Sequence, residues 1–294
     1  MRWFSAIVCS CLILISFASL AAQQLPAAPA NPFPPQGDPR AVALLQRSLT
    51  ALAEGAGIKD VTLTGDAHSI VGGADESGTV SLKATGVDSR IDLSLGSGNR
   101  SEIRNHDAVP LPGSLPSGVP PAAAQAPQPV GVWLGPDGVP HEIAEHNLMT
   151  DPAWFFPEFT LANFADSQSS WLSYIGQENY DGQLVLHISS SQQFADIAGA
   201  AAQTTALLQH LSKMDLYLDP TTLLPVALAF SVHPDDNAIV DVPVEIRFSG
   251  YQSVEGIQVP LHVQKYVNNS LVLDLQLSDP IFNSGLTASD FAIQ

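Results

Sequence analysis

Apolar and polar residues alternate through most of the stretch from Met214 to Phe291, and this pattern constrains the fold more than any other feature of the chain. A period of two places one set of side chains on each face of a pleated sheet. Turn-forming pairs such as Asp219-Pro220, Glu255-Gly256 and Asn268-Asn269 separate the runs. Short connections between neighbouring strands predict an antiparallel meander. Its apolar face has to be covered by other elements.

Two stretches have the spacing of helices. Asp38-Pro39 is typical of a helix N-cap followed by proline in the first turn, and apolar residues then recur at helical spacing from Val42 to Leu52. A second helix is predicted from Ser190 to Leu211, because Ser190 and Gln193 fit a capping box. Small residues in this segment allow close approach, so we expect it to pack on the apolar face of the sheet.

Domain boundaries follow from shifts in composition. Residues 22–37 are rich in Pro, Ala and Gln, which predicts a disordered linker. Residues 38–294 form one domain in this interpretation, because short alternating runs from Val61 to Leu95 predict hairpins and no second core follows the C-terminal sheet. A Pro/Ala-rich insertion at 107–129 interrupts the domain, since proline at that density cannot continue a strand ladder. The predicted fold class is mainly antiparallel β with α (α+β).

The N-terminus has the pattern of a secretory signal peptide, residues 1–21. Arg2 precedes a mostly apolar run that ends at Leu20, and small residues precede a cleavage point after Ala21. Serines interrupt the run and no charged flank follows it, which favours cleavage over an uncleaved anchor. The two cysteines, Cys9 and Cys11, both lie inside it. The mature chain is therefore expected to be periplasmic or secreted, without a disulfide, a thiolate metal site or a cysteine nucleophile.

The charge balance excludes one class of partner. The chain has 29 acidic and 11 basic residues and a net charge of −18. Nucleic acid binding depends on clustered Lys and Arg, so nucleic acid is not expected as a partner. The sequence also lacks a Gly-x-Ser-x-Gly elbow, a P-loop and a dinucleotide fingerprint. We therefore predict no catalytic residue and no cofactor.

Two histidine motifs suggest zinc. His141 and His146 flank Glu142 and Glu145, but the histidines are five residues apart, about 140° around a helix, whereas a metal-binding pair needs i and i+4. A solvated polar helix is the simpler interpretation. No metal ligand is predicted there.

The second motif, His233-Pro234-Asp235-Asp236, resembles the His-Pro-Asp-Asp-Glu motif of zinc-dependent sugar deacetylases, in which the first Asp is a base and His and the second Asp bind metal. Asn237 replaces the Glu, and His262 alone stands where paired histidines are expected downstream. A polar hairpin loop is the favoured interpretation. A deacetylase using this stretch is kept as a less favoured function.

An aromatic cluster, Trp154, Phe155, Phe156 and Phe159, is the densest in the chain. It is typical of core packing where the chain crosses a sheet. The alternative is the mouth or lid of an apolar cavity. Trp171 could join either arrangement.

Several turn and strand motifs carry a family resemblance. They are Tyr217-Leu218-Asp219-Pro220-Thr221, Leu224-Pro225, Tyr251-Gln252-Ser253-Val254-Glu255-Gly256-Ile257, Val259-Pro260 and Asp290-Phe291. Residues 214–291 thereby resemble the periplasmic lipoprotein-carrier superfamily, which includes the outer-membrane lipoprotein-sorting proteins and a related lipid-binding sensor domain. In that superfamily a Phe closes the last strand.

The resemblance implies a strongly curved sheet or incomplete barrel, with helices plugging its concave face and a lipid-accepting cavity between them. The segments Val42–Leu52 and Phe194–Leu211 would be the plug helices. The implied function is an exported, non-enzymatic protein that binds an apolar acyl-chain ligand or a lipid-modified protein. The alternative is an envelope scaffold or sensor domain that binds another protein. The candidate ligand-binding residues are Trp154, Phe155, Phe156, Phe159, Trp171, Phe194, Ile197 and Leu208.

Overall fold

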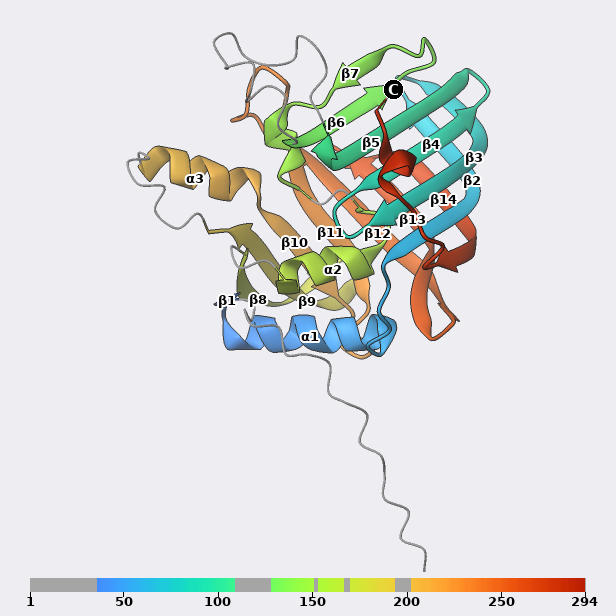
Figure 1. The fold of residues 1–294 in the computed structure, drawn as a ribbon. Helices are drawn as coiled ribbons and strands as arrows, with labels where there is room; N and C mark the ends of the chain where they lie inside the picture. The colour runs from blue at the N-terminus through green and yellow to red at the C-terminus, as the bar shows by residue number, and fades with distance from the viewer. Residues whose placement is uncertain (1–35, 109–127, 151–152, 167–169, 194–201, 294) are drawn as a thin grey trace, which may run out of the picture. The chain divides into compact units, whose positions relative to one another are not determined.

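The computed structural model describes residues 36–108, 128–150, 153–166, 170–193 and 202–293. These form a 14-stranded sheet in the order β1-β8-β9-β10-β11-β12-β13-β14-β2-β3-β4-β5-β6-β7 (Figure 1). Neighbouring strands are antiparallel except for the parallel pair β1 and β8. The sheet is therefore mainly antiparallel, as predicted.

The described strands and helices have the following bounds. The strands are β1 (Gln36–Gly37), β2 (Asp60–Val71), β3 (Ala74–Thr85), β4 (Ser89–Leu95), β5 (Gly98–Ala108), β6 (Gln128–Leu134), β7 (Pro140–Glu142), β8 (Ser170–Tyr180), β9 (Gln183–Gln192), β10 (Met214–Leu218), β11 (Pro225–Val232), β12 (Val242–Val254), β13 (Ile257–Val267) and β14 (Ser270–Phe282). The helices are α1 (Pro39–Ala53), α2 (Pro157–Asp166), α3 (Ala202–Leu211) and the short 3-10 helices η1 (Glu145–Leu148) and η2 (Ala288–Phe291).

The C-terminal meander is confirmed, because β10 to β14 pair consecutively. The next neighbour of β14 is β2, and Leu275 lies opposite Ala67. This pairing joins the N-terminal hairpins β2–β3 and β4–β5 to the meander. The two blocks of alternating sequence therefore form one continuous sheet.

Helix α1 forms as its sequence predicts. The Asp38 side chain accepts a hydrogen bond from the Arg40 N–H at 2.8 Å, and Pro39 occupies the first turn. Leu45 and Leu52 on its inner face are fully buried. The helix packs against α2 and also contacts β8 and β13 (Figure 1). Its apolar stripe thus covers part of the apolar face of the sheet.

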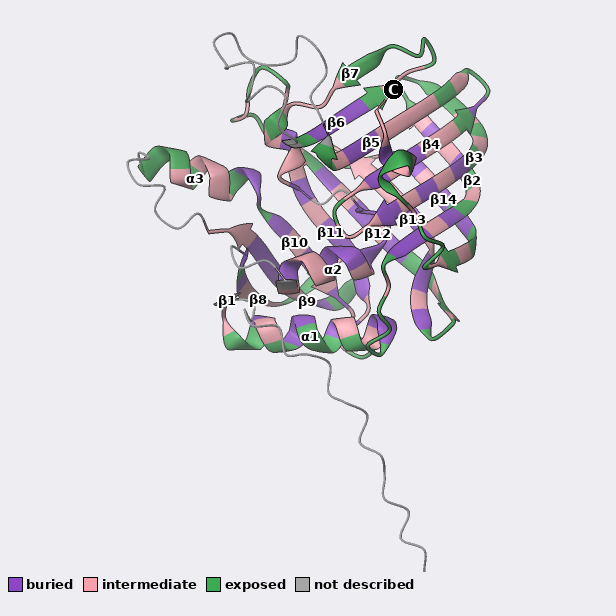
Figure 2. Ribbon diagram, viewed as in Figure 1, coloured by how far each residue is buried: buried purple, intermediate pink, exposed green. Residues whose placement is uncertain are grey.

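The second helix begins later than predicted. Ser190 belongs to β9, where it lies opposite Leu172 and Met214, so the capping box with Gln193 is not formed. The described helix α3 begins at Ala202, it contacts β9, and of its residues only Leu211 is buried (Figure 2). The prediction that this segment covers the apolar face was wrong for the part that the structure describes.

Helix α2 takes that place instead, packed against α1. It follows the aromatic cluster directly, and Phe156 and Phe159 are buried with their rings 5.0 Å apart. The main core contains these rings, the inner face of α1 and the inward residues of the sheet (Figure 2).

The boundary of the predicted insertion and the predicted position of Phe291 also differ from the structure. The insertion predicted at 107–129 falls between β5 and β6, which extend into it until Ala108 pairs with Gln128. Phe291 lies in η2 rather than at the end of a strand, and its side chain is fully buried. Among the described residues, no helix is long and apolar enough to cross a membrane.

Candidate functional site

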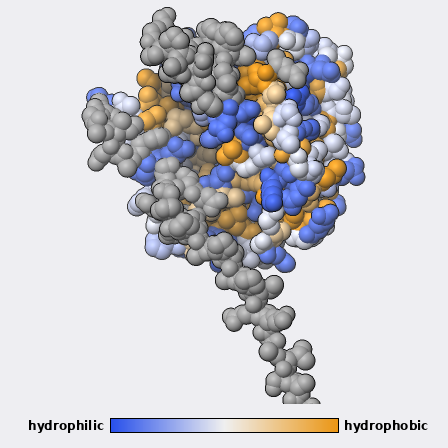
Figure 3. All heavy atoms as spheres, viewed as in Figure 1, coloured by the Kyte–Doolittle hydropathy of each residue, from blue (hydrophilic) through white to orange (hydrophobic). Residues whose placement is uncertain are grey.

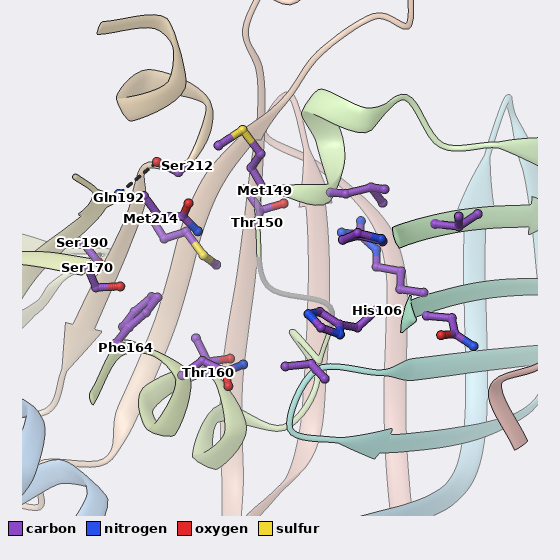
Figure 4. Close-up of a pocket in the computed structure, with 17 residues that line it drawn as sticks. His106, Met149, Thr150, Thr160, Phe164, Ser170, Ser190, Gln192, Ser212 and Met214 are labelled. Atoms are coloured by element: carbon purple, nitrogen blue, oxygen red, sulfur yellow. Dashed lines mark hydrogen bonds between the residues drawn. The ribbon is translucent and has the colours of Figure 1, made fainter. Parts of the chain in front are cut away.

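A cavity of about 510 Å³ opens between two distant parts of the sheet (Figure 4). Strands β5 and β6 line one side, β8, β9 and β10 line the other, and α2 and the segment after η1 lie between them. Its volume is within the roughly 300–1,000 Å³ of small-molecule pockets. On the same side of the molecule, hydrophobic and hydrophilic residues lie next to each other across the surface (Figure 3).

Small hydroxyl side chains form much of one wall. Ser170, Ser190 and Ser212 are all buried and come from β8, β9 and the end of α3. The Ser212 hydroxyl accepts a hydrogen bond from the Gln192 N–H at 3.0 Å, and it donates to the Leu208 carbonyl at 2.8 Å (Figure 4). Because serine is much smaller than the leucines and valines of the core, this wall leaves space open.

Apolar side chains complete the lining. Phe164 from α2, Met149 after η1 and Met214 from β10 are drawn in Figure 4 around the same space. The neighbouring Thr150 is buried, and its Oγ1 has no hydrogen-bond partner among the described residues. The cavity thus offers apolar contact together with a hydroxyl that a ligand could satisfy.

The lining carries a positive charge on Arg104. Arg104 and His106 line the cavity, whereas none of its described lining residues is an acid. Arg104 is 9% exposed, and its Nε donates to Glu102 Oε1 at 3.0 Å. Burial opposes ionisation of Glu102, but the charges of Arg104 and Lys265 outweigh it and lower the pKa of this carboxyl. Two cations therefore share one carboxylate beside the cavity.

Lys265 has few other compensating groups. Burial lowers its pKa, Glu102 raises it again, and the charge of Arg104 lowers it further. Its Nζ lies 4.8 Å from the centre of the Trp154 ring, a cation–π contact. Among the described residues, the charge of Lys265 is thus stabilised by an aromatic ring in addition to Glu102, and not by a second acid.

Asn147 joins η1 to β5 and to the end of β11. Its side-chain Nδ2 donates to the His233 carbonyl, its Oδ1 accepts from the His233 N–H, and both distances are 2.8 Å. Its own carbonyl accepts a hydrogen bond from Arg104 Nη1 at 3.1 Å. The chain after η1, which lines the cavity, is therefore anchored to β5 and to the end of β11.

The aromatic residues predicted to bind a ligand lie in the core. Trp154, Phe155, Phe156 and Phe159 are at most 3% exposed, and none is among the lining residues of the cavity. Their position matches the core-packing interpretation of the cluster. A role in binding stays a prediction.

The other predicted residues are placed as follows. Trp171 is 42% exposed, while its neighbours Ser170 and Leu172 are buried. Leu208 is half-buried on α3. Phe194 and Ile197 lie outside the described residues.

Sequence reasoning missed Arg104 and the serine wall. Arg104 lies between Ile103 and Asn105 in a strand of mostly polar residues, so the sequence does not mark it as buried. The run Ser189-Ser190-Ser191 did carry a signal, because small polar residues replace apolar ones towards the end of a strand. Only the three-dimensional arrangement shows that this position faces a cavity.

The two zinc-like motifs are not formed as metal sites. His141 lies in β7 and stacks on Trp133 with ring centres 4.2 Å apart, while His146 lies in η1, so they do not share a helix. The His233-Pro234-Asp235-Asp236 stretch connects β11 and β12 as a polar loop. His233 instead lies near His210 and Asp241, outside the cavity, and their ligand atoms are within 4.8 Å of one another.

Comparisons with known proteins give structural matches. No protein-family model and no curated protein matches the chain. A domain described as an outer membrane lipoprotein-sorting protein from Vibrio parahaemolyticus is 13% identical, covering 86% of this chain and 96% of that chain, with a TM-score of 0.48. The chain matches lipoprotein-sorting and LolA-superfamily structures over 86% of its length.

Two further structures have similar scores. A DUF1329 family protein from Desulfovibrio piger is 11% identical, covering 86% of this chain and 97% of that chain, with a TM-score of 0.47. A LolA superfamily protein from Nitrosomonas europaea is 9% identical, covering 86% and 97%, with a TM-score of 0.46.

Proposed function

We propose that this chain is an exported, non-enzymatic binding protein that holds an amphipathic ligand, with an acyl chain and an anionic head group, in the cavity beside α2. The observation that carries the proposal is the sign of the charge on the residues that line the cavity. In a chain with 29 acidic residues, the cavity is lined by Arg104 and apolar side chains and by none of the described acids. The acyl group of a lipid-modified protein would supply the apolar part of this chemistry, and a free fatty acid or lysophospholipid would supply both parts.

The position of the lining supports a curved sheet. Met214 on β10 and Arg104 on β5 line one cavity, yet β11, β12, β13, β14, β2, β3 and β4 lie between these strands. At about 4.8 Å per strand, a flat sheet would separate β10 and β5 by about 38 Å. We therefore infer an incomplete barrel whose concave face holds α1 and α2. The opening left between its two ends is the cavity.

The energetics suit a ligand that has to be released again. Burial of an acyl chain contributes about 0.8 kcal/mol per methylene, so a partly buried chain binds with moderate affinity. A charge-assisted hydrogen bond from Arg104 would add about 1.5–3 kcal/mol and fix the head group. Carboxylate and phosphate head groups would both fit this contact. The hydroxyl of Thr150 is a further donor.

Binding of palmitate and hexadecanol to the delipidated mature protein tests the proposal. We expect Arg104→Met to weaken palmitate binding about ten- to hundredfold relative to hexadecanol, because the two ligands differ in the anionic group. Arg47→Met, which removes an exposed arginine of α1, is the matched control. Lysophosphatidic acid distinguishes a phosphate preference from a carboxylate preference. Absence of binding by all three ligands, with no lipid co-purifying, would contradict the proposal.

A further inference from the structure

Three potential metal ligands come together on the outside of the cavity wall. His210 lies near the end of α3, and His233 and Asp241 lie at the two ends of the loop between β11 and β12. His210 Nε2 is 2.8 Å from Asp241 Oδ1, and His233 Nδ1 is 3.4 Å from the same oxygen. Their ligand atoms all lie within 4.8 Å of one another. Side chains from α3 and from both ends of this loop therefore converge on one point.

The donor set suits a divalent transition metal. Two imidazoles and one carboxylate are a combination that binds Zn²⁺, with metal–ligand distances of about 2.0–2.2 Å. In a tetrahedral arrangement, those distances place the ligand atoms about 3.3–3.6 Å apart. The separation of 3.4 Å between His233 Nδ1 and Asp241 Oδ1 agrees with this value, whereas the 2.8 Å between His210 Nε2 and Asp241 Oδ1 is the shorter distance of a hydrogen bond. An ion would fit after small side-chain movements.

A second observation comes from the burial of His233. The residue is 4% exposed, and within the described part of the chain its Nε2 has no hydrogen-bond partner. Buried polar atoms are nearly always satisfied, so this buried imidazole lacks a full set of partners. Its Nδ1 lies 3.1 Å from the Val240 carbonyl oxygen. Nδ1 also faces Asp241 Oδ1, at 3.4 Å, so it is the ring nitrogen that would bind the ion in place of its contact with Val240.

The backbone of His233 is fixed by its neighbours. Asn147 bonds both its N–H and its carbonyl, so the position of the ring does not depend on the flexible loop that follows. The rings of His146 and His210 lie 5.9 and 5.8 Å from it, measured between ring centres. A preorganised ligand reduces the entropy cost of binding an ion.

We propose that His210, His233 and Asp241 bind a divalent transition-metal ion such as Zn²⁺, with water in the remaining coordination position. The ion would tie α3 to the β11–β12 loop. This matters for α3, because Leu211 is its one described buried residue. Ser212, directly after this helix, lines the cavity. The metal would therefore fix one wall of the cavity without touching the ligand.

Zinc titration of the tag-free, chelator-treated mature protein tests this site. We expect one equivalent of Zn²⁺ to bind, to raise the Tm and to slow hydrogen exchange in α3. His210→Ala and Asp241→Ala should each weaken binding at least about tenfold, since loss of an outer-shell partner alone costs about 10–100-fold. Both side chains are partly exposed, 44% and 46%, so the metal-free variants should keep the Tm of the metal-free parent.

His68→Ala is the matched control. His68 also faces an aspartate, Asp75, across the β2–β3 hairpin, but no third ligand joins this pair among the described residues. Zinc affinity should be unchanged in this variant, and Co²⁺ bound to the parent should give the strong visible absorption of a tetrahedral site. Zinc affinity unaffected by both His210→Ala and Asp241→Ala, or no saturable binding by the parent, would overturn the proposal. Either result leaves the lipid-binding proposal standing, because the three residues lie outside the cavity.

Discussion

Asn147 and His233 exchange two hydrogen bonds of 2.8 Å, in which the side-chain amide of one satisfies both backbone groups of the other. Both residues are buried, at 8% and 4% exposed. The contact joins η1 to the end of β11, and the Asn147 carbonyl extends the connection to Arg104 on β5. A single amide side chain thus fixes the position of the cavity rim and of a proposed metal ligand.

Asn147→Ala should therefore be costly. It leaves the N–H and carbonyl of His233 unpaired in a buried place, and each such group costs about 1–3 kcal/mol. We expect the free energy of unfolding to fall by about 2–4 kcal/mol, measured by urea denaturation. Asn237→Ala, in the exposed part of the same loop, should cost far less. Equal losses in the two variants would show that the paired contact does not form.

Met149→Trp should block the cavity. Met149 is half-buried on the rim and projects into the space that Figure 4 shows, so a larger ring would occupy volume that a ligand needs. We expect palmitate affinity to fall at least about tenfold, the effect of roughly two methylenes no longer buried, while the Tm changes little. Val139→Trp, at an exposed site between β6 and β7, should bind as the parent does. Unchanged binding by Met149→Trp would place the ligand elsewhere.

Glu158 should make stability depend on pH. Burial in the first turn of α2 raises its pKa from 4.5 to about 7, and its Oε2 has no hydrogen-bond partner among the described residues. Because the folded state holds this proton more tightly than the unfolded chain, the contribution of Glu158 to stability is complete below pH 4.5 and is lost as the pH rises towards and through 7. The loss is at most about 3 kcal/mol.

The pH effect can be assigned with a pair of variants. Glu158→Gln cannot ionise, so its free energy of unfolding should fall less than that of the parent between about pH 5 and 7.5. Glu145→Gln, at an exposed position of η1, should follow the parent. Parallel curves for parent and Glu158→Gln would assign the pH dependence to other groups.

Gly65→Ala should weaken the pairing of β2 with β14. A Cβ at Gly65 would lie 2.1 Å from the carbonyl oxygen of Gln276, which belongs to the backbone and cannot move aside. We expect a loss of about 2–4 kcal/mol in the free energy of unfolding. At Gly57 a Cβ meets nothing within 4 Å, so Gly57→Ala is the control. A loss no larger than in the control would mean that the strands are not this close.

The sequence predicted the local elements well and their long-range arrangement poorly. The alternation beyond Met214 and the cap at Asp38-Pro39 depend on neighbouring residues, so the meander and α1 could be found. The start of the second helix could not, because Ser190 fits both a capping box and a continuing strand, and pairing with Met214 selects the strand. Helix α2 was missed because the aromatic run before it has no clear periodicity.

The cavity could not be predicted for a different reason. Its lining depends on strands that are distant in the sequence, and no residue pattern encodes empty space. Arg104 lies in a mostly polar strand, and only the structure shows that it is buried and bonded to Glu102 and Asn147. Trp154 and Phe155 were predicted to bind a ligand because they belong to the aromatic cluster, but both side chains are packed in the core. The hydrophobic pattern of the sequence identified residues of the packed core, whereas the cavity lies where side-chain packing is incomplete.

The pairing of Leu275 with Ala67 has a consequence for biosynthesis. When β2 leaves the ribosome, its partner β14 has not yet been translated, so one edge of the first hairpins stays open until almost the whole polypeptide exists. Contacts between such distant segments form slowly, and open strand edges are prone to aggregate. Holdase chaperones that shield nascent chains should therefore matter for this protein, whose sheet is completed only by its last strand.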